Sequence, residues 1–241
     1  MSIHILKTIP HLIKAVALHF ISVGNNAIAS RGEFNVVLSG GSSPKKLYEL
    51  LASPEYKEQV NWEKVNFFFG DERDVPANDS ENNAYMAKRT LLDPLNIPKS
   101  NIFPINTSLS PQEAAKNYTS TITSQLSRQD LQFDLILLGL GENAHTASLF
   151  PYTSVLTDKS TSIQAVFLED QKVYRITMTA PLINQARNIT FLVYGQQKAK
   201  AVHQVLEGEF DPEQYPAQLI DPEKGELHWF LDEAAASLLK R

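Results

Sequence analysis

Three short runs of apolar residues, each ending in glycine and each followed by a stretch with helical spacing, constrain the fold of this chain most strongly. They are FNVVLSGG at residues 34–41, VNFFFG at 65–70 and FDLILLGLG at 133–141. Continuous rather than alternating apolar runs are typical of strands that are covered on both faces. Their alternation with helices predicts an α/β fold, in which a mostly parallel, Rossmann-like sheet carries helices on both faces.

The remaining stretches complete this pattern, and residues 1–241 are expected to form one domain. No internal repeat, low-complexity tract or long linker divides them. Ser110 and Glu113 have the spacing of a capping box at a helix start. Helices are predicted at residues 10–30, from Pro44, at 80–91, 111–127 and 233–239, and after Pro181 and Gln196. Further strands are predicted near the N-terminus and at 164–168, 173–178 and 188–194. An LHWFLD segment leads into the last helix, and residues 208–225 are interpreted as a surface excursion.

The composition excludes several classes of function. The 241 residues carry a formal net charge of −5 and no dense Lys/Arg run, which argues against a nucleic-acid-binding face. The chain has no cysteine, so it forms no disulfide, thiolate zinc site or thiol nucleophile. The N-terminus lacks the pattern of a secretory signal, and no apolar run approaches the length of a membrane span. We therefore expect a cytoplasmic protein that binds no membrane and needs no obligate protein partner.

Ligands of open α/β sheets bind outside the carboxyl ends of the strands, which singles out the three glycine-ended loops. In the first, SGGSSP, Gly40 and Gly41 let the backbone approach a ligand closely, and Ser42 offers a hydroxyl. The following helix presents free N–H groups to an anion. This pattern predicts a phosphate cradle, with an ordinary structural turn as the alternative. It is neither a Walker A loop nor a GxGxxG fingerprint, so no nucleotide cofactor is expected.

Charged residues in two other segments are candidates for holding a substrate. In the second loop, GDERDVP, Arg73 can clamp a phosphate and Asp71 can hold a water or a sugar hydroxyl, although a solvated turn is the alternative. Further along, Arg175 lies in an otherwise apolar predicted strand, Arg187 precedes another, and Lys198 opens a helix. Each of these cations taken alone is most simply a surface charge. A guanidinium buried in a strand needs a partner, however, and a bound phosphate would provide one.

The third loop, GLGENAHTASLFP, is the most informative. His145 follows the predicted strand at the start of a predicted helix, where an imidazole is reachable and near neutral pH can act as base and then as acid. A structural histidine is the alternative. The chain has no GxSxG elbow and no HExxH pair, so neither a serine-hydrolase triad nor a metal site is expected.

In this order, the loops resemble the 6-phosphogluconolactonase family, which belongs with the glucosamine/galactosamine-6-phosphate isomerase superfamily. The resemblance runs from SGGSSP through FFFGDERDVPANDSENN, NIFPI, GLGENAHTASLFP and APLINQARNITFLVYGQQKAKAV to LHWFLD, and the combination of GDER with HTASLFP is highly specific. It implies hydrolysis of 6-phospho-D-glucono-1,5-lactone to 6-phospho-D-gluconate, in the oxidative branch of the pentose phosphate pathway, without a cofactor or metal. A small phosphorylated sugar lactone is then the substrate.

By this resemblance His145 is the catalytic histidine. One departure concerns its neighbours, because the family usually reads Asp-Gly-His where this chain has Asn143-Ala144-His145. Asn143 can accept an imidazole N–H but brings no charge, and Asp71 is expected to supply a nearby carboxylate, so both are assigned to catalysis with His145. The resemblance assigns substrate and phosphate binding to Gly40, Gly41, Ser42, Arg73, Arg175 and Lys198.

Two other functions remain open at this point. An amino-sugar-phosphate deaminase or isomerase of the same superfamily is expected to use a His-Glu pair, and the position of that glutamate is occupied here by Phe150. A non-catalytic sugar-phosphate-binding protein of the same fold is suggested by Asn143. Regulators of that kind usually carry a DNA-binding segment, for which the first strand begins too near the N-terminus.

Overall fold

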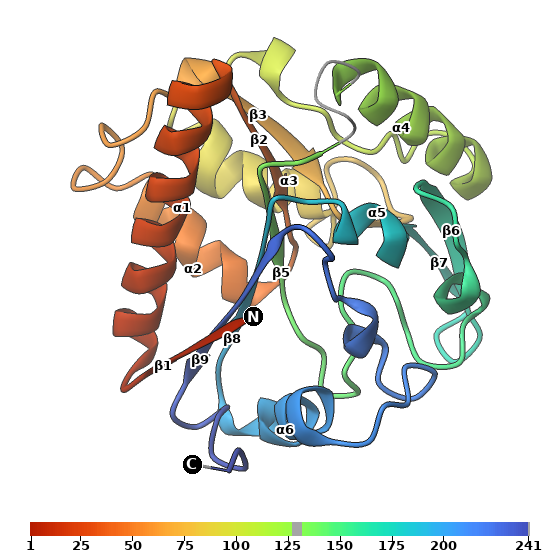
Figure 1. Cartoon of the computed structure of the whole chain (residues 1–241). Coiled ribbons are helices and arrows are strands. Elements are labelled where there is room, and N and C mark those ends of the chain that lie inside the picture. The colour runs from red at the N-terminus through yellow and green to blue at the C-terminus, as the bar shows by residue number, and fades with distance from the viewer. Residues whose placement is uncertain (127–131, 241) are drawn as a thin grey trace.

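The predicted parallel sheet is the centre of the fold. A computed structural model describes residues 1–126 and 132–240, and Figure 1 shows their arrangement. Six strands, all parallel to their neighbours, lie in the order β1-β9-β8-β5-β2-β3. Their bounds are β1 Ser2–Leu6, β2 Phe34–Leu38, β3 Val65–Phe69, β5 Leu135–Leu138, β8 Asn188–Val193 and β9 Glu226–Asp232.

A second, three-stranded antiparallel sheet lies beside the first and corrects one expectation. It consists of β4 (Asp71–Arg73), β7 (Val173–Met178) and β6 (Ile163–Leu168), in the order β4-β7-β6. The GDERDVP segment was expected to be a loop, but its first three charged residues form β4. They do so because their backbone groups pair with β7, which the local sequence does not reveal.

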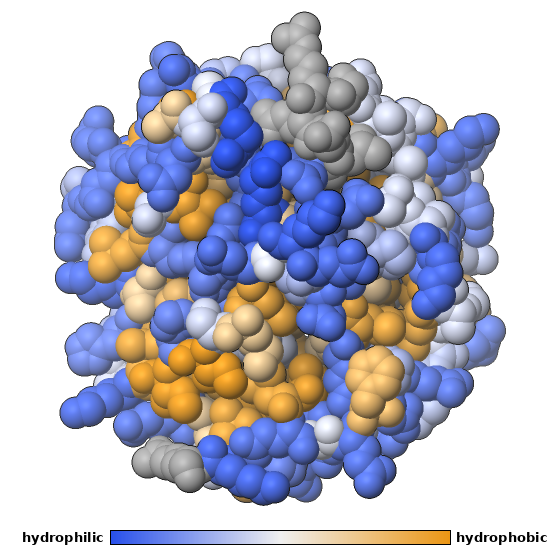
Figure 2. All heavy atoms as spheres, in the orientation of Figure 1, coloured by the Kyte–Doolittle hydropathy of each residue, from blue (hydrophilic) through white to orange (hydrophobic). Residues whose placement is uncertain are grey.

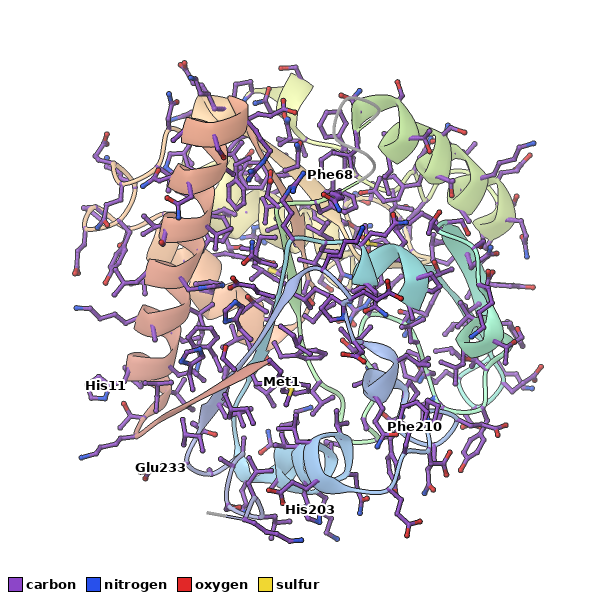
Figure 3. All side chains as sticks on the ribbon, viewed as in Figure 1. Met1, His11, Phe68, His203, Phe210 and Glu233 are labelled. Atoms are coloured by element: carbon purple, nitrogen blue, oxygen red, sulfur yellow. The ribbon has the colours of Figure 1, made fainter. Side chains whose placement is uncertain are left out.

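Helices cover both faces of the parallel sheet, as predicted (Figure 1). Alternate side chains of β2 illustrate this arrangement, because Val36 and Leu38 pack in one apolar cluster while Val37 packs in the other. Phe68 lies inside the second of these clusters, fully buried (Figure 3). The helices are α1 (Ile9–Arg31), α2 (Ser42–Leu51) and α3 (Asn83–Ala87) on one face, and α4 (Pro111–Leu126), α5 (Ala180–Asn184) and α6 (Ala199–Glu207) on the other.

Helix α1 is longer and more apolar than expected. The Thr8 side chain caps its first turn by accepting the N–H of His11, and Gly32 ends it with φ of 86°. Its 23 residues include an 18-residue window of mean hydropathy 1.3, so in length and composition the helix meets the requirement for a membrane span, against the expectation that no segment does. Because residues such as Val16 and Phe20 are completely buried against the sheet, α1 serves as a core helix here.

Three predicted helices differ in detail from those observed. The Ser110–Glu113 capping box is present, with hydroxyl and carboxylate 2.6 Å apart, while the expected end of that helix at Ser127 lies outside the described residues. The helix predicted at 80–91 begins only at Asn83 and continues as a π-helix, Lys88–Leu92. Residues 233–239 form turns instead of a helix. So short an alanine-rich segment does not sustain a helix by itself, and Asp232 directs its backbone by accepting the N–H of Ala235.

The strand order places a ligand crevice between β2 and β5. From β2 the chain passes to β3 on one side, and then returns to β5, β8 and β9 on the other side. Ligands of open α/β sheets bind where the order reverses in this way.

The exposed Ile3 and Ile5 lie on β1, at the opposite end of the sheet order from β3, and Figure 2 shows apolar side chains gathered over that edge.

Candidate active site

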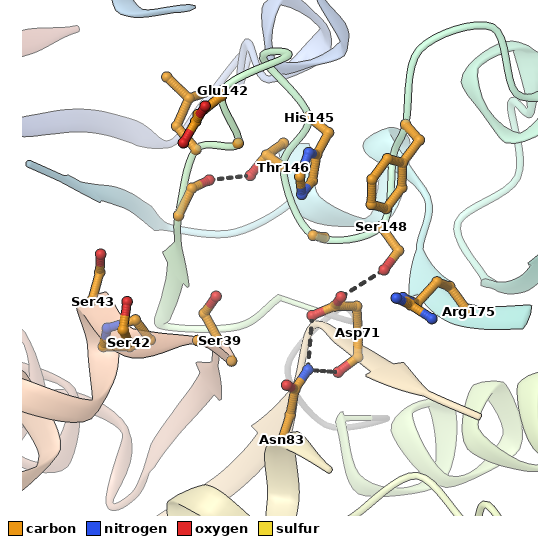
Figure 4. Close-up of a pocket in the computed structure, with 18 of the residues that line it drawn as sticks. Ser39, Ser42, Ser43, Asp71, Asn83, Glu142, His145, Thr146, Ser148 and Arg175 are labelled. Atoms are coloured by element: carbon orange, nitrogen blue, oxygen red, sulfur yellow. Dashed lines mark hydrogen bonds between the residues drawn. The ribbon is translucent and has the colours of Figure 1, made fainter. Parts of the chain in front are cut away.

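A pocket of about 550 Å³ lies at the carboxyl ends of the strands, where the order reverses. It is lined by the segments that follow β2, β3, β5 and β8, and by β7 of the second sheet. Asn143 contacts Nδ1 of His145 but lines a neighbouring cavity and not this pocket. The pocket brings together Gly40, Gly41, Ser42, Asp71, Arg73, His145, Arg175 and Lys198. Figure 4 shows the serine loop on one side of His145 and Arg175 on the other.

The serine loop has the geometry of an anion cradle. Gly41 precedes α2 with φ of 97°, a left-handed conformation that favours glycine, and no side chain caps the helix. The first N–H groups of α2 therefore point into the pocket without an intrahelical partner. Gly40 is required for a different reason: a Cβ there would lie 1.8 Å from Oδ1 of Asn83.

The loop that carries His145 consists of turns, and the helix predicted to start there is absent from it. Its shape comes from three hydrogen bonds. Gly141 N–H donates to the carbonyl of His145 at 2.8 Å, the Thr146 hydroxyl donates to the carbonyl of Gly139 at 2.9 Å, and Ala217 N–H donates to the carbonyl of Ala144 at 3.0 Å. Ala217 belongs to the stretch expected to be a mere surface excursion. That stretch instead supports the loop.

His145 is held as a neutral base. Its Nδ1 lies 2.5 Å from Oδ1 of Asn143, and because a carbonyl oxygen only accepts, Nδ1 carries the proton and Nε2 is left with a free lone pair. Burial, as the largest cause, and the positive charges of Lys198, Arg175 and Arg73 together lower the pKa of His145 to about 4. The imidazole is therefore uncharged at neutral pH.

Asp71 is fixed by two side chains that do not include the imidazole. The Ser148 hydroxyl donates to its Oδ2 at 2.6 Å, and the Asn83 amide donates to its carbonyl at 2.9 Å and to Oδ1 at 3.3 Å (Figure 4). Burial raises the pKa of Asp71, while the Ser148 hydrogen bond and the charges of Arg73 and Arg175 oppose that rise. Next to it, Glu72 accepts the N–H of Asn83 at 2.7 Å and so anchors the start of α3.

Two guanidinium groups face the pocket from adjacent strands. Arg73 of β4 and Arg175 of β7 are directly paired in the antiparallel register, where like charges repel unless an anion lies between them. Arg73 contacts Glu81, and Arg175 donates to the Gln171 amide at 3.2 Å. Burial lowers the pKa of Arg175, as does the charge of Arg73. The pair therefore suits a doubly charged ligand.

Of the two other candidate cations, Lys198 lies at the pocket and Arg187 does not. Lys198, in the turn after β8, lines the pocket, and burial lowers its pKa. Arg187 lies away from it and forms an ion pair with the buried Asp134, 3.6 Å away, which Arg31 also contacts at 2.8 Å.

Among the residues that the structure describes, no group of three His, Asp or Glu side chains is arranged to hold a metal ion. Metal independence stays a prediction.

Sequence reasoning missed several residues of the site. Asn83 and Ser148 contact Asp71 from other segments of the chain, so no local pattern indicates them. Gln171 contacts Arg175 across the turn between β6 and β7. Gly141 carried a usable signal, since a second glycine after the strand suggests a close approach; a Cβ there would lie 2.0 Å from Nδ1 of His145.

Comparisons with known proteins show the family of this chain. A family model described as glucosamine-6-phosphate isomerases/6-phosphogluconolactonase matches residues 7–229. The 6-phosphogluconolactonase of Synechocystis is 42% identical, covering 89% of this chain and 88% of the relative, and that of Haemophilus influenzae is 37% identical, covering 85% and 87%. The structure of 6-phosphogluconolactonase from Trypanosoma cruzi superposes with a TM-score of 0.87 at 26% identity, covering 100% and 97%. The chain belongs to the glucosamine-6-phosphate isomerase/6-phosphogluconolactonase family.

Proposed function

We propose that this chain hydrolyses 6-phospho-D-glucono-1,5-lactone to 6-phospho-D-gluconate, and is thus a carboxylic ester hydrolase of the oxidative pentose phosphate pathway. The observation that carries this proposal is a single pocket that contains a neutral imidazole with a free Nε2 and three cations. Relatives named 6-phosphogluconolactonase, matched over most of their length, support it. The cytoplasmic location and the lack of an obligate partner stay predictions.

His145 is assigned the proton transfers. Its Nε2 removes a proton from a water molecule as the oxygen of that water attacks the lactone carbonyl carbon. The carbonyl oxygen becomes an oxyanion, for which the Arg73 guanidinium, which lines the pocket, is the donor. As the oxyanion collapses, the bond to the ring oxygen breaks and the imidazolium returns its proton to that oxygen. The product is the open-chain acid.

The phosphate is assigned to the cationic part of the pocket. Arg175, Lys198 and the start of α2 hold its charge, and this binding fixes the lactone carbon near His145. Because Lys198 and Arg175 are among the charges that lower the pKa of His145, a bound phosphate counters them and raises that pKa. The base is therefore stronger when the phosphorylated substrate is present.

Asp71 is assigned to a substrate hydroxyl. Its carboxylate is held by Ser148 and Asn83 and lines the pocket, while its hydrogen bonds do not reach the imidazole. A fixed, buried carboxylate of this kind orients a sugar hydroxyl and so aligns the lactone ring. The carboxylate that would assist His145 directly is absent, since Asn143 occupies that place.

The decisive experiment follows the hydrolysis of freshly prepared 6-phosphogluconolactone against its spontaneous opening. We expect turnover by the wild-type protein and a loss of about 10²–10⁴-fold in His145→Ala, the usual contribution of a general base. The variant should still bind 6-phosphogluconate, as measured by calorimetry. EDTA should leave the rate unchanged. A wild-type rate equal to background would contradict the function, and retention of more than about a tenth of turnover in His145→Ala would contradict the role of the base.

A further inference from the structure

Phe150 forms a wall shared by two cavities. It lines the active-site pocket of about 550 Å³ and also a second pocket of about 690 Å³. The second pocket lies over the turn between β6 and β7 and over the segment that follows Phe150, and Phe167 is among its lining residues. Its described lining contains no lysine or arginine, so it is not a second phosphate site.

The Phe150 ring also covers one face of the catalytic imidazole. The two ring centroids are 4.0 Å apart, and the planes differ by 17°. The backbone of Gly141 lies against the Nδ1 and Cε1 edge of the same imidazole, and Asn143 accepts its Nδ1–H. These three contacts fix both the plane of the imidazole and its rotation within that plane, and His145 lines the active-site pocket in this orientation.

We propose that Phe150 is a positioning residue for the reaction: its ring holds the plane of His145 and separates the imidazole from the water of the second pocket. The inference rests on the proposed role of His145 as the base. An imidazole face covered by an aromatic ring is not hydrated, and loss of hydration favours the neutral form that a base requires. A smaller side chain at residue 150 joins the two cavities and admits water to this face.

The test compares Phe150→Leu with Phe150→Tyr, which keeps the aromatic ring, and with Phe167→Leu, which alters the second pocket without touching His145. In Phe150→Leu we expect kcat for 6-phosphogluconolactone to fall about 10-fold, since small misplacements of a catalytic group cost up to about 100-fold. KM should change little. The acidic limb of the pH profile should move upward from near pH 4, toward the ordinary histidine pKa of 6.5. Phe150→Tyr should restore both properties, and Phe167→Leu should leave both unchanged.

An NMR titration of His145 in the wild-type protein tests the same idea without any variant. A depressed pKa is expected; titration at the ordinary value of 6.5 would show that the imidazole is hydrated and would overturn the proposal. So would an unchanged kcat and pH profile in a folded Phe150→Leu protein. These outcomes are distinct from a failure of the proposed function, in which the wild-type protein itself would not accelerate lactone opening.

Discussion

Asn143 determines which nitrogen of His145 carries the proton, yet it would add no charge to stabilise the imidazolium of the proposed mechanism. Its amide oxygen lies 2.5 Å from Nδ1, in the position where a carboxylate would both orient the ring and stabilise its positive form. In serine proteases, replacing the equivalent aspartate by asparagine lowers kcat about 10⁴-fold. A lactone is far more reactive than an amide, so the cost of the neutral partner is expected to be much smaller here.

An aspartate substitution, Asn143→Asp, should supply the missing charge. The new negative charge favours the protonated imidazole and raises the pKa of His145 from about 4, by roughly one unit or more. Since the neutral imidazole is the active form, activity is lost as pH falls through this pKa, and the acidic limb moves upward. We expect kcat at neutral pH to rise about 3- to 10-fold, because the imidazolium is better stabilised. Unchanged kcat and pH profile would show that the contact has no catalytic role.

The cations of the pocket are expected to recognise the phosphate more than the lactone. Arg175→Ala and Lys198→Ala each remove a charge-assisted hydrogen bond worth about 1.5–3 kcal/mol, or about 10-fold to over 100-fold in affinity. Their effect on kcat/KM should be large for 6-phosphogluconolactone and small for unphosphorylated gluconolactone. Lys200→Ala is the control, since this lysine is exposed on α6 outside the pocket. Equal losses for both substrates would remove Arg175 and Lys198 from the phosphate site.

At the scale of elements, the turn after β5 contains two glycines with very different surroundings. A Cβ at Gly141 would lie 2.0 Å from Nδ1 of His145 and 2.9 Å from Oδ1 of Asn143, whereas a Cβ at Gly139 would meet nothing within 4 Å. Gly141→Ala should displace the movable imidazole and not the backbone. We expect kcat to fall about 100-fold with little change in the free energy of unfolding. Gly139→Ala is the matched control, and similar kinetics in both variants would refute this account.

The elements that sequence predicts well are those whose signal is local. Continuous apolar runs located β2, β3 and β5, and the capping box located the start of α4. Two elements whose form depends on distant partners were not predicted. Strand β4 exists because it pairs with β7, and the loop around His145 takes its turns from bonds to Gly139, Gly141 and Ala217. A residue pattern over ten positions contains no information about such partners.

The residues of the candidate site also fall into those that the local sequence predicts and those that it does not. Parallel strands end at one edge of a sheet, so residues that follow β2, β3 and β5 were expected to meet, and the pocket does contain them. Side chains that hold these residues in place were not foreseen. Ser148 and Asn83 act on Asp71 from two different segments, and the stacking of Phe150 on His145 depends on turns that were predicted as helix.

At the scale of the whole molecule, the parallel sheet is the common wall of two apolar clusters. Successive residues of β9 alternate between them, because Trp229 and Leu231 pack in the cluster that includes α4, α5 and α6, while Phe230 packs in the cluster that includes α1 and α2. The first cluster also contains Ile176 and Val166 of the small antiparallel sheet. Every strand of the large sheet except β1 carries residues of both clusters, so none of these five can separate without exposing both, which supports the proposal that the chain is one domain.

The two tryptophans of the chain make this proposal testable, because each reports on one cluster. Trp62 packs with the α1 side, and Trp229 stacks on Phe191 on the opposite side, with ring centroids 3.8 Å apart. In Trp62→Phe and Trp229→Phe, the remaining tryptophan follows the unfolding of its own side. We expect the two fluorescence transitions in urea to coincide with each other and with circular dichroism once each is corrected for the stability of its variant, as two-state unfolding requires. If fluorescence and circular dichroism gave different urea midpoints within one variant, the two faces of the sheet would unfold independently. The chain would then comprise two cooperative units.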